Sequence, residues 1–445
     1  MDYERIDFME KPVKVVVVGM GARAMIYAKE SLKHPKRFKV VGVVDINEDR
    51  IRDAQEVFYI PDNNCFHSVE ELLSVPKFAD AVINGTMDAL HVETTIPLLK
   101  RGYDVLLEKP FAINQEEADR LLQCVNETGR TVMVCHVLRY APFYKEIKKV
   151  LRKGMIGKII NIQMNEQVSY FHESVSYVRG KYASPIMCGS GMLLSKCSHD
   201  LDIMAWLMNG NLPYAVSSVG SVIQFIPEMA PERAGTHCMV NCPVERECIY
   251  SAKRLYIENP QRWSNNIWHD IGKENPTDKE KEQLLKDIYN SFGRCVYRCN
   301  LEIVDHQSVL IQFADGATGT FSMNGGASAS GRNIHITGTK GELVGRFEEE
   351  RFTVHVIAPE EKGGRVSMVV DVSETQKGNA HGNGDQAIVE DFIAVLRGKQ
   401  PSDCCTTLND SMVGHKIVFL AEASRKAGGE LLKYKKERAY LCEKV

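Results

Sequence analysis

The stretch VKVVVVGMGARA, residues 13–24, decides the fold of this chain. A run of β-branched residues leads directly into Gly19-Met-Gly21-Ala-Arg-Ala24, which fits the pattern G-x-G-x-x-A between a strand and a helix. In that pattern Gly19 allows a tight turn, Gly21 lets the backbone approach a pyrophosphate, and Ala24 permits close packing of helix on strand. The helix start at Ala22 and Arg23 offers free N–H groups to phosphates. The stretch therefore predicts a dinucleotide-binding turn.

A carboxylate closes the next apolar run, FKVVGVVD, which ends at Asp45. A carboxylate at this position accepts hydrogen bonds from a ribose diol and repels a 2′-phosphate, so Asp45 favours NAD over NADP. Arg23 and Arg50 keep NADP open as an alternative. A glycine turn that binds nothing is the remaining interpretation.

Residues 1–138 are predicted to form an α/β domain with a doubly wound (Rossmann) parallel sheet. Short apolar runs alternate with helix-length amphipathic segments, as in βαβ units. Crossover helices cover both faces of such a sheet, which explains why the first two runs are almost wholly apolar. The helices are expected to follow residues 22, 47, 92 and 114. The five strands are expected at Val13 to Val18, Phe38 to Val44, Ala79 to Asn84, Asp104 to Leu107 and Thr131 to Cys135.

Residues 139–445 are predicted to form an α+β domain with a large, mainly antiparallel open sheet. Segments such as KIINIQMNEQVSY, VDHQSVLIQF and FTVHVI alternate or run as strands between turn signals such as ADG and GTKG. A region rich in Pro, Cys and charge, at about 226–300, is expected to be an insertion of loops and short helices.

The composition indicates a soluble, enzyme-sized protein and excludes several other classes. The 445 residues are 44% hydrophobic and 25% charged, near the globular average, which argues against disorder and fibrous structure. The net charge of −3 comes without a long like-charge run, so neither a nucleic acid nor a membrane is an expected partner. The absence of a secretory pattern and of a membrane-length apolar stretch leads us to expect a cytoplasmic location.

Several further motifs give the chain a family resemblance, which extends from Lys11 to the segment SRKAGG near the C-terminus. The sequence resembles the Gfo/Idh/MocA oxidoreductases, which include glucose-fructose oxidoreductase and inositol dehydrogenase. The resemblance is carried by Glu108-Lys109-Pro110, by Thr86 and His91, by Arg139-Tyr140-Ala141-Pro142, and by the segment from Ser195 to Asp202. It implies that Thr86, His91, Glu108 and Lys109 lie beside the cofactor, and that the second domain pairs copies into a homodimer or homotetramer.

The sequence departs from the family pattern at one position of the expected active-site helix. Many members carry Asp four residues before the active-site His, whereas this chain has Ser195 followed by Lys196. A Lys–His variant is therefore an alternative to the usual Asp–His arrangement.

Lys109 is the first candidate catalytic residue. It follows a parallel strand at its carboxyl end, where open α/β sheets bind ligands, and burial beside a cofactor lowers the pKa of an amine. The resemblance implies substrate hydrogen bonding or proton transfer. The alternative is a structural pair of Lys109 with Glu108.

The segment around His199 carries the other catalytic candidates. Lys196, His199 and Asp202 are spaced by three residues, so a helix would project them from one face. His199 is the preferred general base, Lys196 a contact to a substrate hydroxyl or a base-tuning group, and Asp202 a structural or orienting carboxylate. A solvated polar helix face is the alternative.

Asp202 and four further residues are candidate substrate contacts. His136 follows the fifth predicted strand, Arg139 opens the second domain, and His306 begins a later strand. His381 belongs to the loop His381-Gly-Asn-Gly-Asp385, which could reach the pocket or simply cap the next helix. For each single His, a buried or surface position without function is the alternative.

Cysteines concentrate in the predicted insertion. Cys238, Cys242 and Cys248 are followed by Cys295 and Cys299, and a loop-rich insertion gains stability from a structural zinc site. Cys238, Cys242, Cys248 and Cys299 are the candidate ligands. The spacing is not that of a C-x-x-C knuckle, so reduced buried thiols or one disulfide are alternatives.

The leading functional prediction is an NAD-dependent oxidoreductase that acts on a secondary hydroxyl of a sugar, glycoside or cyclitol. One alternative is a glycoside lyase or hydrolase that retains and recycles a tightly bound NAD. Another is a non-catalytic protein that senses NAD or sugar, although a pure sensor would need neither Lys109 nor His199.

Overall fold

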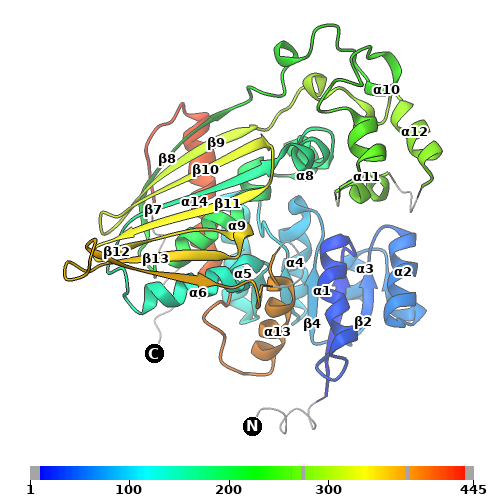
Figure 1. The fold of residues 1–445 in the computed structure, drawn as a ribbon. Helices are drawn as coiled ribbons and strands as arrows, with labels where there is room; N and C mark the ends of the chain where they lie inside the picture. Colours follow the sequence, from blue (N-terminus) through cyan, green and yellow to red (C-terminus); the bar gives the residue numbers. More distant parts are fainter. Residues whose placement is uncertain (1–10, 262, 272–275, 377–380, 436–445) are drawn as a thin grey trace.

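Two sheets organise the chain (Figure 1). The computed structural model describes residues 11–261, 263–271, 276–376 and 381–435. A six-stranded sheet in the order β3-β2-β1-β4-β5-β6 is followed by a nine-stranded sheet in the order β14-β13-β12-β11-β7-β10-β9-β8-β15. The predicted fold class, a Rossmann sheet followed by an α+β domain, is confirmed.

Every pair in the first sheet is parallel. Its strands are β1 (Val13–Val18), β2 (Phe38–Val44), β3 (Cys65–Phe66), β4 (Ala81–Asn84), β5 (Asp104–Leu107) and β6 (Val132–Val134). Strand β3 was not predicted from the sequence, because two residues carry no periodic pattern. The strand order reverses between β1 and β4, and ligands bind outside the carboxyl ends of the strands at such a point.

Helices α1 (Ala22–Lys33), α2 (Glu48–Phe58), α3 (Val69–Ser74), α4 (His91–Lys100) and α5 (Gln115–Thr128) connect these strands. Their ends follow from the sequence. The side chain of Asn47 accepts hydrogen bonds from the amides of Asp49 and Arg50, and that of Asn114 accepts one from Glu117. Such caps satisfy amides that a helix start leaves unpaired. The start of α1 has no side-chain cap and no acidic residue, which leaves its amides to a ligand.

The second sheet is antiparallel except for the parallel pair β7–β10. Its strands are β7 (Ile159–Ser169), β8 (Pro213–Ser221), β9 (His306–Phe313), β10 (Thr318–Ala327), β11 (Gly331–Gly338), β12 (Gly341–Arg346), β13 (Arg351–Ile357), β14 (Arg365–Asp371) and β15 (Leu432–Lys433). Burial alternates along β9, where Val309 and Ile311 are buried while Ser308 and Leu310 are exposed. One face of the sheet therefore carries the core and the other faces solvent.

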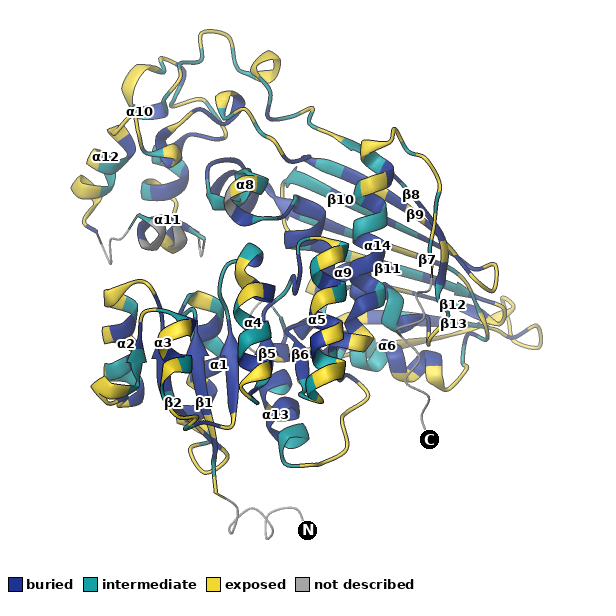
Figure 2. Cartoon of the chain, turned by 180° about the vertical axis from the view of Figure 1, so that it is seen from behind, coloured by how far each residue is buried: buried dark blue, intermediate teal, exposed yellow. Residues whose placement is uncertain are grey.

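Helices cover the inner face of the second sheet, as the view from behind shows (Figure 2). They are α6 (Pro142–Arg152), α9 (Met192–Leu207) and α14 (Leu408–Lys426), with the shorter α7 (Tyr170–His172) and α8 (Pro185–Cys188) beside them. Leu201 and Met204 of α9 share a buried core with Phe321. A Cβ on Gly319 would lie 2.8 Å from the sulfur of Met204, so α9 rests directly on β10.

The chain returns to the first sheet after completing the second. Helix α13 (Gly384–Leu396) buries Ile388 and Phe392 in the same core as Val15 and Val17 of β1. The amide of Val134 donates to the carbonyl oxygen of Thr406 at 2.8 Å. The division into 1–138 and 139–445 stays a prediction, and part of the second segment packs on the first domain.

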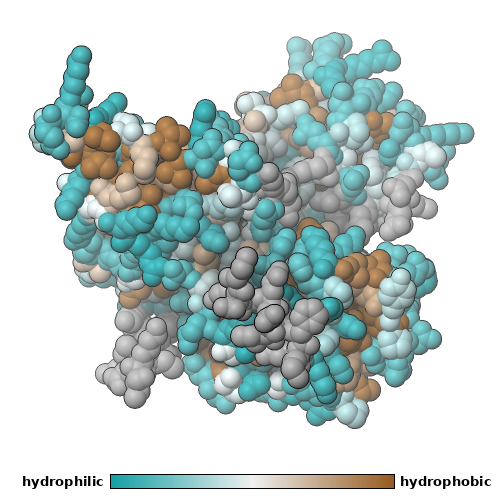
Figure 3. All heavy atoms as spheres, turned by 60° about the horizontal axis from the view of Figure 1, so that its bottom comes forward, coloured by the Kyte–Doolittle hydropathy of each residue, from teal (hydrophilic) through white to brown (hydrophobic). Residues whose placement is uncertain are grey.

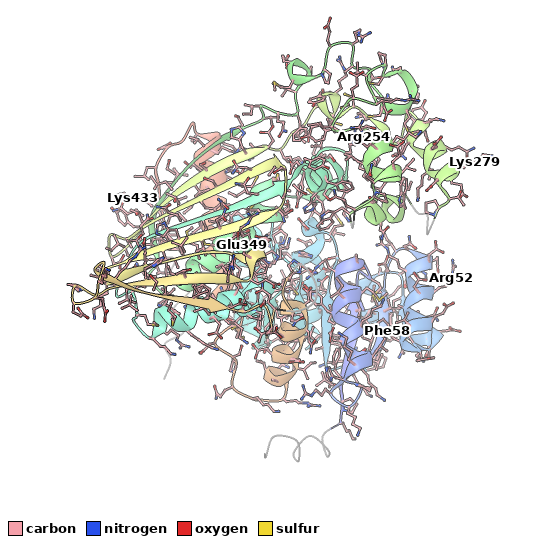
Figure 4. The ribbon with its side chains drawn as sticks, viewed as in Figure 1. Arg52, Phe58, Arg254, Lys279, Glu349 and Lys433 are labelled. Carbon is pink, nitrogen blue, oxygen red and sulfur yellow. The ribbon has the colours of Figure 1, made fainter. Side chains whose placement is uncertain are left out.

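The region at about 226–300 has a small core of its own. Tyr256, Trp268, Leu285 and Phe292 are buried in it, and its helices are α10 (Cys238–Asn241), α11 (Ser264–Asp270) and α12 (Asp278–Lys286). The region stands over the carboxyl edge of the Rossmann sheet (Figure 1). Figure 4 shows Arg254 and Lys279 on this region and Arg52 and Phe58 on α2 opposite. Among the described helices, none combines the length and apolar character that crossing a bilayer requires.

Candidate active site

The glycine turn after β1 has the geometry of a phosphate cradle. Gly19 has a φ of +76°, and a Cβ there would lie 2.7 Å from the amide nitrogen of Thr86. No atom lies within 4 Å of a Cβ placed on Gly21, so a ligand can approach the backbone there. Ala24 is fully buried, and a Cβ on Gly85 would lie 2.8 Å from that of Ala24. The residues present fit a dinucleotide pyrophosphate at the start of α1, where Ala22 is exposed.

Asp45 is buried against this turn. One carboxylate oxygen accepts a hydrogen bond from the amide of Met20 at 2.7 Å, and the other accepts from the amide of Asn47 at 2.9 Å. Arg50 lies 3.8 Å from the first oxygen. The carboxylate therefore stabilises the glycine turn and lies where β2 ends, the position expected for a ribose contact.

Arg23 forms a bridge between the two parts of the chain. Its guanidinium lies 3.0 Å from Glu108 and 2.5 Å from Asp385, which belongs to α13. Burial raises the pKa of Glu108, but Arg23 and Lys109 outweigh burial and lower it. The guanidinium of Arg23 is paired with these two carboxylates, and the cofactor contact predicted for Arg23 stays a prediction.

His91 and Thr86 lie at the carboxyl edge of the first sheet, after β4. His91 is buried, and its ring nitrogens lie 2.6 Å from the carbonyl oxygen of Pro110 and 3.0 Å from that of Thr86. The hydroxyl of Thr86 donates to Asn84 at 3.0 Å. His91 therefore joins the turn after β4 to the segment that carries Lys109.

Lys109 reaches from the Rossmann sheet to α9. Its ammonium donates a hydrogen bond to the carbonyl oxygen of Ser195 at 2.6 Å, one helical turn before His199. Burial lowers the pKa of Lys109, and Lys196 adds to this effect against the opposing charge of Glu108. An amine with a lowered pKa can exchange a proton near neutral pH.

Lys196 belongs to a buried network of four charges between α9 and the sheet. Its ammonium lies 2.8 Å from Glu166 of β7. Arg332 of β11 lies 2.8 Å from both Glu166 and Asp200 through the same nitrogen, Nε. Burial raises the pKa of Asp200 to about 6, although Arg332 opposes the shift. The network uses Asp200, four residues after Lys196 on α9. The shared role of Lys196, His199 and Asp202 stays a prediction.

His199 lies in a cluster of imidazole rings from four different elements. The ring centroids of His136 and His381 lie 5.7 Å and 6.0 Å from that of His199, and that of His415 lies 5.4 Å from His136. Burial lowers the pKa of all four histidines. Nδ1 of His199 is enclosed without a hydrogen-bond partner, whereas Nε2 is not enclosed. A neutral imidazole with an accessible nitrogen can accept a proton.

Arg139 and Asp202 are paired with each other rather than aimed at a ligand. Their side chains form two hydrogen bonds, of 2.7 Å and 2.5 Å, and both are almost completely buried. Arg139 also donates to the carbonyl oxygens of Cys405 and Asp410. The geometry favours the orienting role predicted for Asp202, with His136 Nε2 3.8 Å away.

His381 and His306 each have a carboxylate partner. His381 Nδ1 lies 3.1 Å from Asp385, which brings the loop before α13 to His199. His306 Nδ1 lies 2.7 Å from Asp305 at the start of β9, and 37% of its side chain is exposed. The structure therefore brings His381 into the imidazole cluster and leaves His306 outside it.

The cysteines of the inserted region surround a guanidinium. Buried Arg179 donates to the sulfur of Cys238 at 3.3 Å, and Cys238, Cys242, Cys248 and Cys295 line one small cavity with it. Cys299 donates instead to the carbonyl oxygen of Cys295. Within the part of the chain that the structure describes, no three His, Cys, Asp or Glu residues are placed to hold a metal ion. The geometry gives the predicted zinc ligands no support, and the cysteines described there are free thiols.

Several polar residues of this cleft were not predicted from the sequence. Glu166, Asp200, Arg332 and His415 come from strands and helices where a single polar residue carries no local signal. His415, fully buried on α14, accepts a hydrogen bond from the amide of Phe111. Glu166, Asp200 and Arg332 come together only because β7 pairs with β11 and α9 packs against the sheet.

The fold and the glycine turn define a two-domain, dinucleotide-binding oxidoreductase. Residues 13–136 match the GFO_IDH_MocA description "Oxidoreductase family, NAD-binding Rossmann fold", and residues 148–412 match its companion "Oxidoreductase family, C-terminal alpha/beta domain". The chain therefore belongs to the Gfo/Idh/MocA oxidoreductase family, and the resemblance stated from the motifs is confirmed.

Relatives and solved structures agree with this assignment. YteT of Bacillus subtilis (strain 168) is 24% identical over 402 residues, which cover 87% of this chain and 89% of YteT. The scyllo-inositol 2-dehydrogenase (NAD(+)) of the same organism is 26% identical over 216 residues, or 48% of this chain and 59% of that protein. A levoglucosan dehydrogenase in complex with NADH and L-sorbose has a TM-score of 0.69 at 18% identity, covering 96% of this chain and 100% of that chain. This likeness shows a shared fold.

The buried imidazoles predict an acid-sensitive fold. Burial lowers the pKa values of His136, His199 and His415 well below the ordinary 6.5, so below that pH the unfolded chain binds protons that the folded chain does not. Stability is therefore retained above pH 6.5 and lost as the pH falls, by up to about 1.4 kcal/mol per pH unit for each histidine. Urea unfolding at pH 7.5, 6.5 and 5.5 measures this slope.

The variant His415→Gln is expected to reduce the slope by about one proton, because Gln cannot titrate. The matched control is His67→Gln on the surface, where a hydrogen bond to Glu48 raises the pKa of His67. An unchanged slope for His415→Gln would show that this imidazole is not held neutral.

Proposed function

We propose that the protein is an NAD-dependent oxidoreductase that transfers a hydride between a secondary hydroxyl of a sugar, glycoside or cyclitol and nicotinamide. The observation that supports it best is the contact of Lys109 with the carbonyl oxygen of Ser195, which places Lys109 beside His199 at the carboxyl edge of the Rossmann sheet. The relatives that act on inositol and levoglucosan support the substrate class.

The cofactor would lie along the glycine turn. Gly19, Gly21 and Ala24 would allow the pyrophosphate to approach the start of α1, and Asp45 would bind the adenosine ribose. Bound NAD supplies the hydride acceptor in the oxidative direction. Asp45 disfavours the 2′-phosphate of NADP, and Arg23 is committed to Glu108 and Asp385, so we favour NAD over NADP.

The residues of the chain would supply the proton chemistry. Oxidation of an alcohol requires a group that accepts the hydroxyl proton as the hydride leaves. His199 is neutral because burial and Lys109 lower its pKa, and its Nε2 is accessible. Lys109 would hydrogen-bond the same hydroxyl, while Lys196, held by Glu166, would contact a neighbouring hydroxyl or tune the base. His136, Arg139 and Asp202 would orient these groups from behind.

Substitution of the proton-transfer pair tests the proposed function. Lys109→Met and His199→Asn are each expected to lower kcat by about 100-fold to 10,000-fold, because each removes a positioned acid–base group. For His199→Asn the NAD dissociation constant, measured by protein fluorescence titration, is expected to change by no more than about twofold, since the side chain of His199 does not contact the pyrophosphate turn.

Screening polyols and sugars with NAD by absorbance at the NADH band supplies the turnover assay. The control is Lys158→Met at the surface, where the ammonium pairs with Asp315. Full turnover in both variants would refute the assignment of Lys109 and His199 as catalytic residues. Tight NAD binding by the unsubstituted protein without turnover of any polyol or sugar would favour a sensing protein.

Coenzyme preference tests the predicted role of Asp45. Asp45→Asn keeps an oxygen that can accept from the amide of Met20 but removes the negative charge. The ratio of NADP affinity to NAD affinity is expected to rise by about tenfold, because a charged hydrogen-bond acceptor contributes about 1.5–3 kcal/mol. Isothermal titration with both coenzymes measures the ratio, and an unchanged ratio would refute the ribose contact.

We further propose that copies of the chain form a homodimer or homotetramer through the outer face of the second sheet. Leu310, Val344 and Val369 lie on this face with exposed side chains. Figure 3 shows apolar side chains gathered at the upper left, on the side of this sheet. A strand face with apolar side chains in solvent is typical of an association surface.

A charge on this face is expected to separate the copies. Leu310→Glu should lower the mass measured by sedimentation equilibrium to that of one chain, because a carboxylate cannot be buried there without a partner. The comparison variant is Leu310→Ala, which removes the apolar side chain without adding a charge, and so distinguishes lost apolar area from added charge. A single-chain mass for the unsubstituted protein would refute the assembly.

A further inference from the structure

The side chain of Arg332 is anchored at one edge only. Its Nε lies 2.8 Å from Glu166 and 2.8 Å from Asp200, and 11% of the side chain is exposed. This anchoring comes from β7 and α9, which hold the guanidinium between the sheet and the helix that carries His199. The position of the guanidinium is therefore set before any ligand binds.

The other edge of the guanidinium has no hydrogen-bond partner among the residues that the structure describes. Neither Nη1 nor Nη2 donates a hydrogen bond to a residue that the structure describes, and neither atom is enclosed. Buried and half-buried polar groups normally have a hydrogen-bond partner from the protein or from a bound molecule. Two coplanar N–H donors are thus available to a ligand.

The surroundings of His199 are electropositive. Besides burial, Lys109, the neighbouring histidines and Arg332 lower the pKa of His199. Two of the nearby carboxylates have cationic partners, since Glu108 pairs with Arg23 and Glu166 pairs with Lys196. An anion bound beside His199 would be attracted by both Lys109 and Arg332.

We propose that Arg332 binds a carboxylate of the substrate, so that the protein acts on a sugar acid such as a hexuronate. The planar Nη donors match the two oxygens of a carboxylate. Glu166 and Asp200 already offset the charge of Arg332, which favours a singly charged carboxylate over a doubly charged phosphate. The inference rests on the proposed function, because the reacting hydroxyl must lie at Lys109 and His199 while the carboxylate lies at Arg332.

Matched pairs of acidic and neutral sugars test this inference. Isothermal titration of the full-length protein with saturating NAD would use glucuronate and glucose, galacturonate and galactose, and mannuronate and mannose. At least one acid is expected to bind about tenfold to a hundredfold more tightly than its neutral counterpart. Glucose 6-phosphate is included to separate a carboxylate site from a phosphate site.

The variant Arg332→Lys keeps a positive charge but loses the two parallel donors. It is expected to abolish the preference for the acid while changing the affinity for the neutral sugar by no more than about threefold. If Arg332 had only a structural role, the substitution would weaken the binding of both sugars equally and leave the ratio of their affinities unchanged. Arg351→Lys, an exposed arginine of the same sheet, is the matched control.

Three results would overturn the inference: no binding of any acid, a neutral sugar that binds as tightly as its acid in every pair, or a sugar phosphate that binds more tightly than every acid. Failure of the proposed function would look different. In that case NAD would not bind, or bound NAD would not be reduced by any neutral polyol or acidic sugar.

Discussion

The hydrogen bond from Lys109 to the carbonyl oxygen of Ser195 is the contact on which the cleft depends, because it joins the edge of one sheet to the helix that lies on the other. It brings the amine of Lys109, which follows β5, next to the imidazole of His199 on α9. The return of α13 to the first sheet secures this arrangement, since Arg23 pairs there with Asp385. An ion pair between residues near the two ends of the chain therefore helps to hold the first sheet and the C-terminal helices together.

Buried charge is concentrated along this junction. Lys196, Glu166, Arg332 and Asp200 neutralise one another between α9 and the sheet, and Arg139 does the same with Asp202 beneath it. Isolated ions would be costly to bury, and each pair is acceptable only because it is matched and hydrogen-bonded. The polar atoms left without a hydrogen bond to a described residue and not enclosed are Nε2 of His199 and the Nη atoms of Arg332, and the proposed chemistry uses these atoms together with Lys109.

The histidines show which part of the site the local sequence predicts and which part it does not. His136, His199 and His381 were proposed as site residues from their positions after a strand, on a helix and in a loop. Their meeting with His415 could not be predicted, because the four rings come from positions up to 279 residues apart (415 − 136) with no local pattern between them. Conversely, Arg139 and Asp202 were placed at the substrate, and the tertiary structure pairs them with each other in the interior.

The sequence by itself determined five of the six Rossmann strands, the glycine turn, Asp45 at the end of β2 and the family, because these depend on residues close together in the chain. Gly19 must adopt a positive φ, and apolar runs of this length must be buried on both faces. Only the tertiary structure decided which charges pair, that Arg179 contacts Cys238, and that Arg332 lies against Asp200 beside His199. Such pairings are set by strand register and helix docking, which join residues far apart in sequence, so no local pattern specifies them.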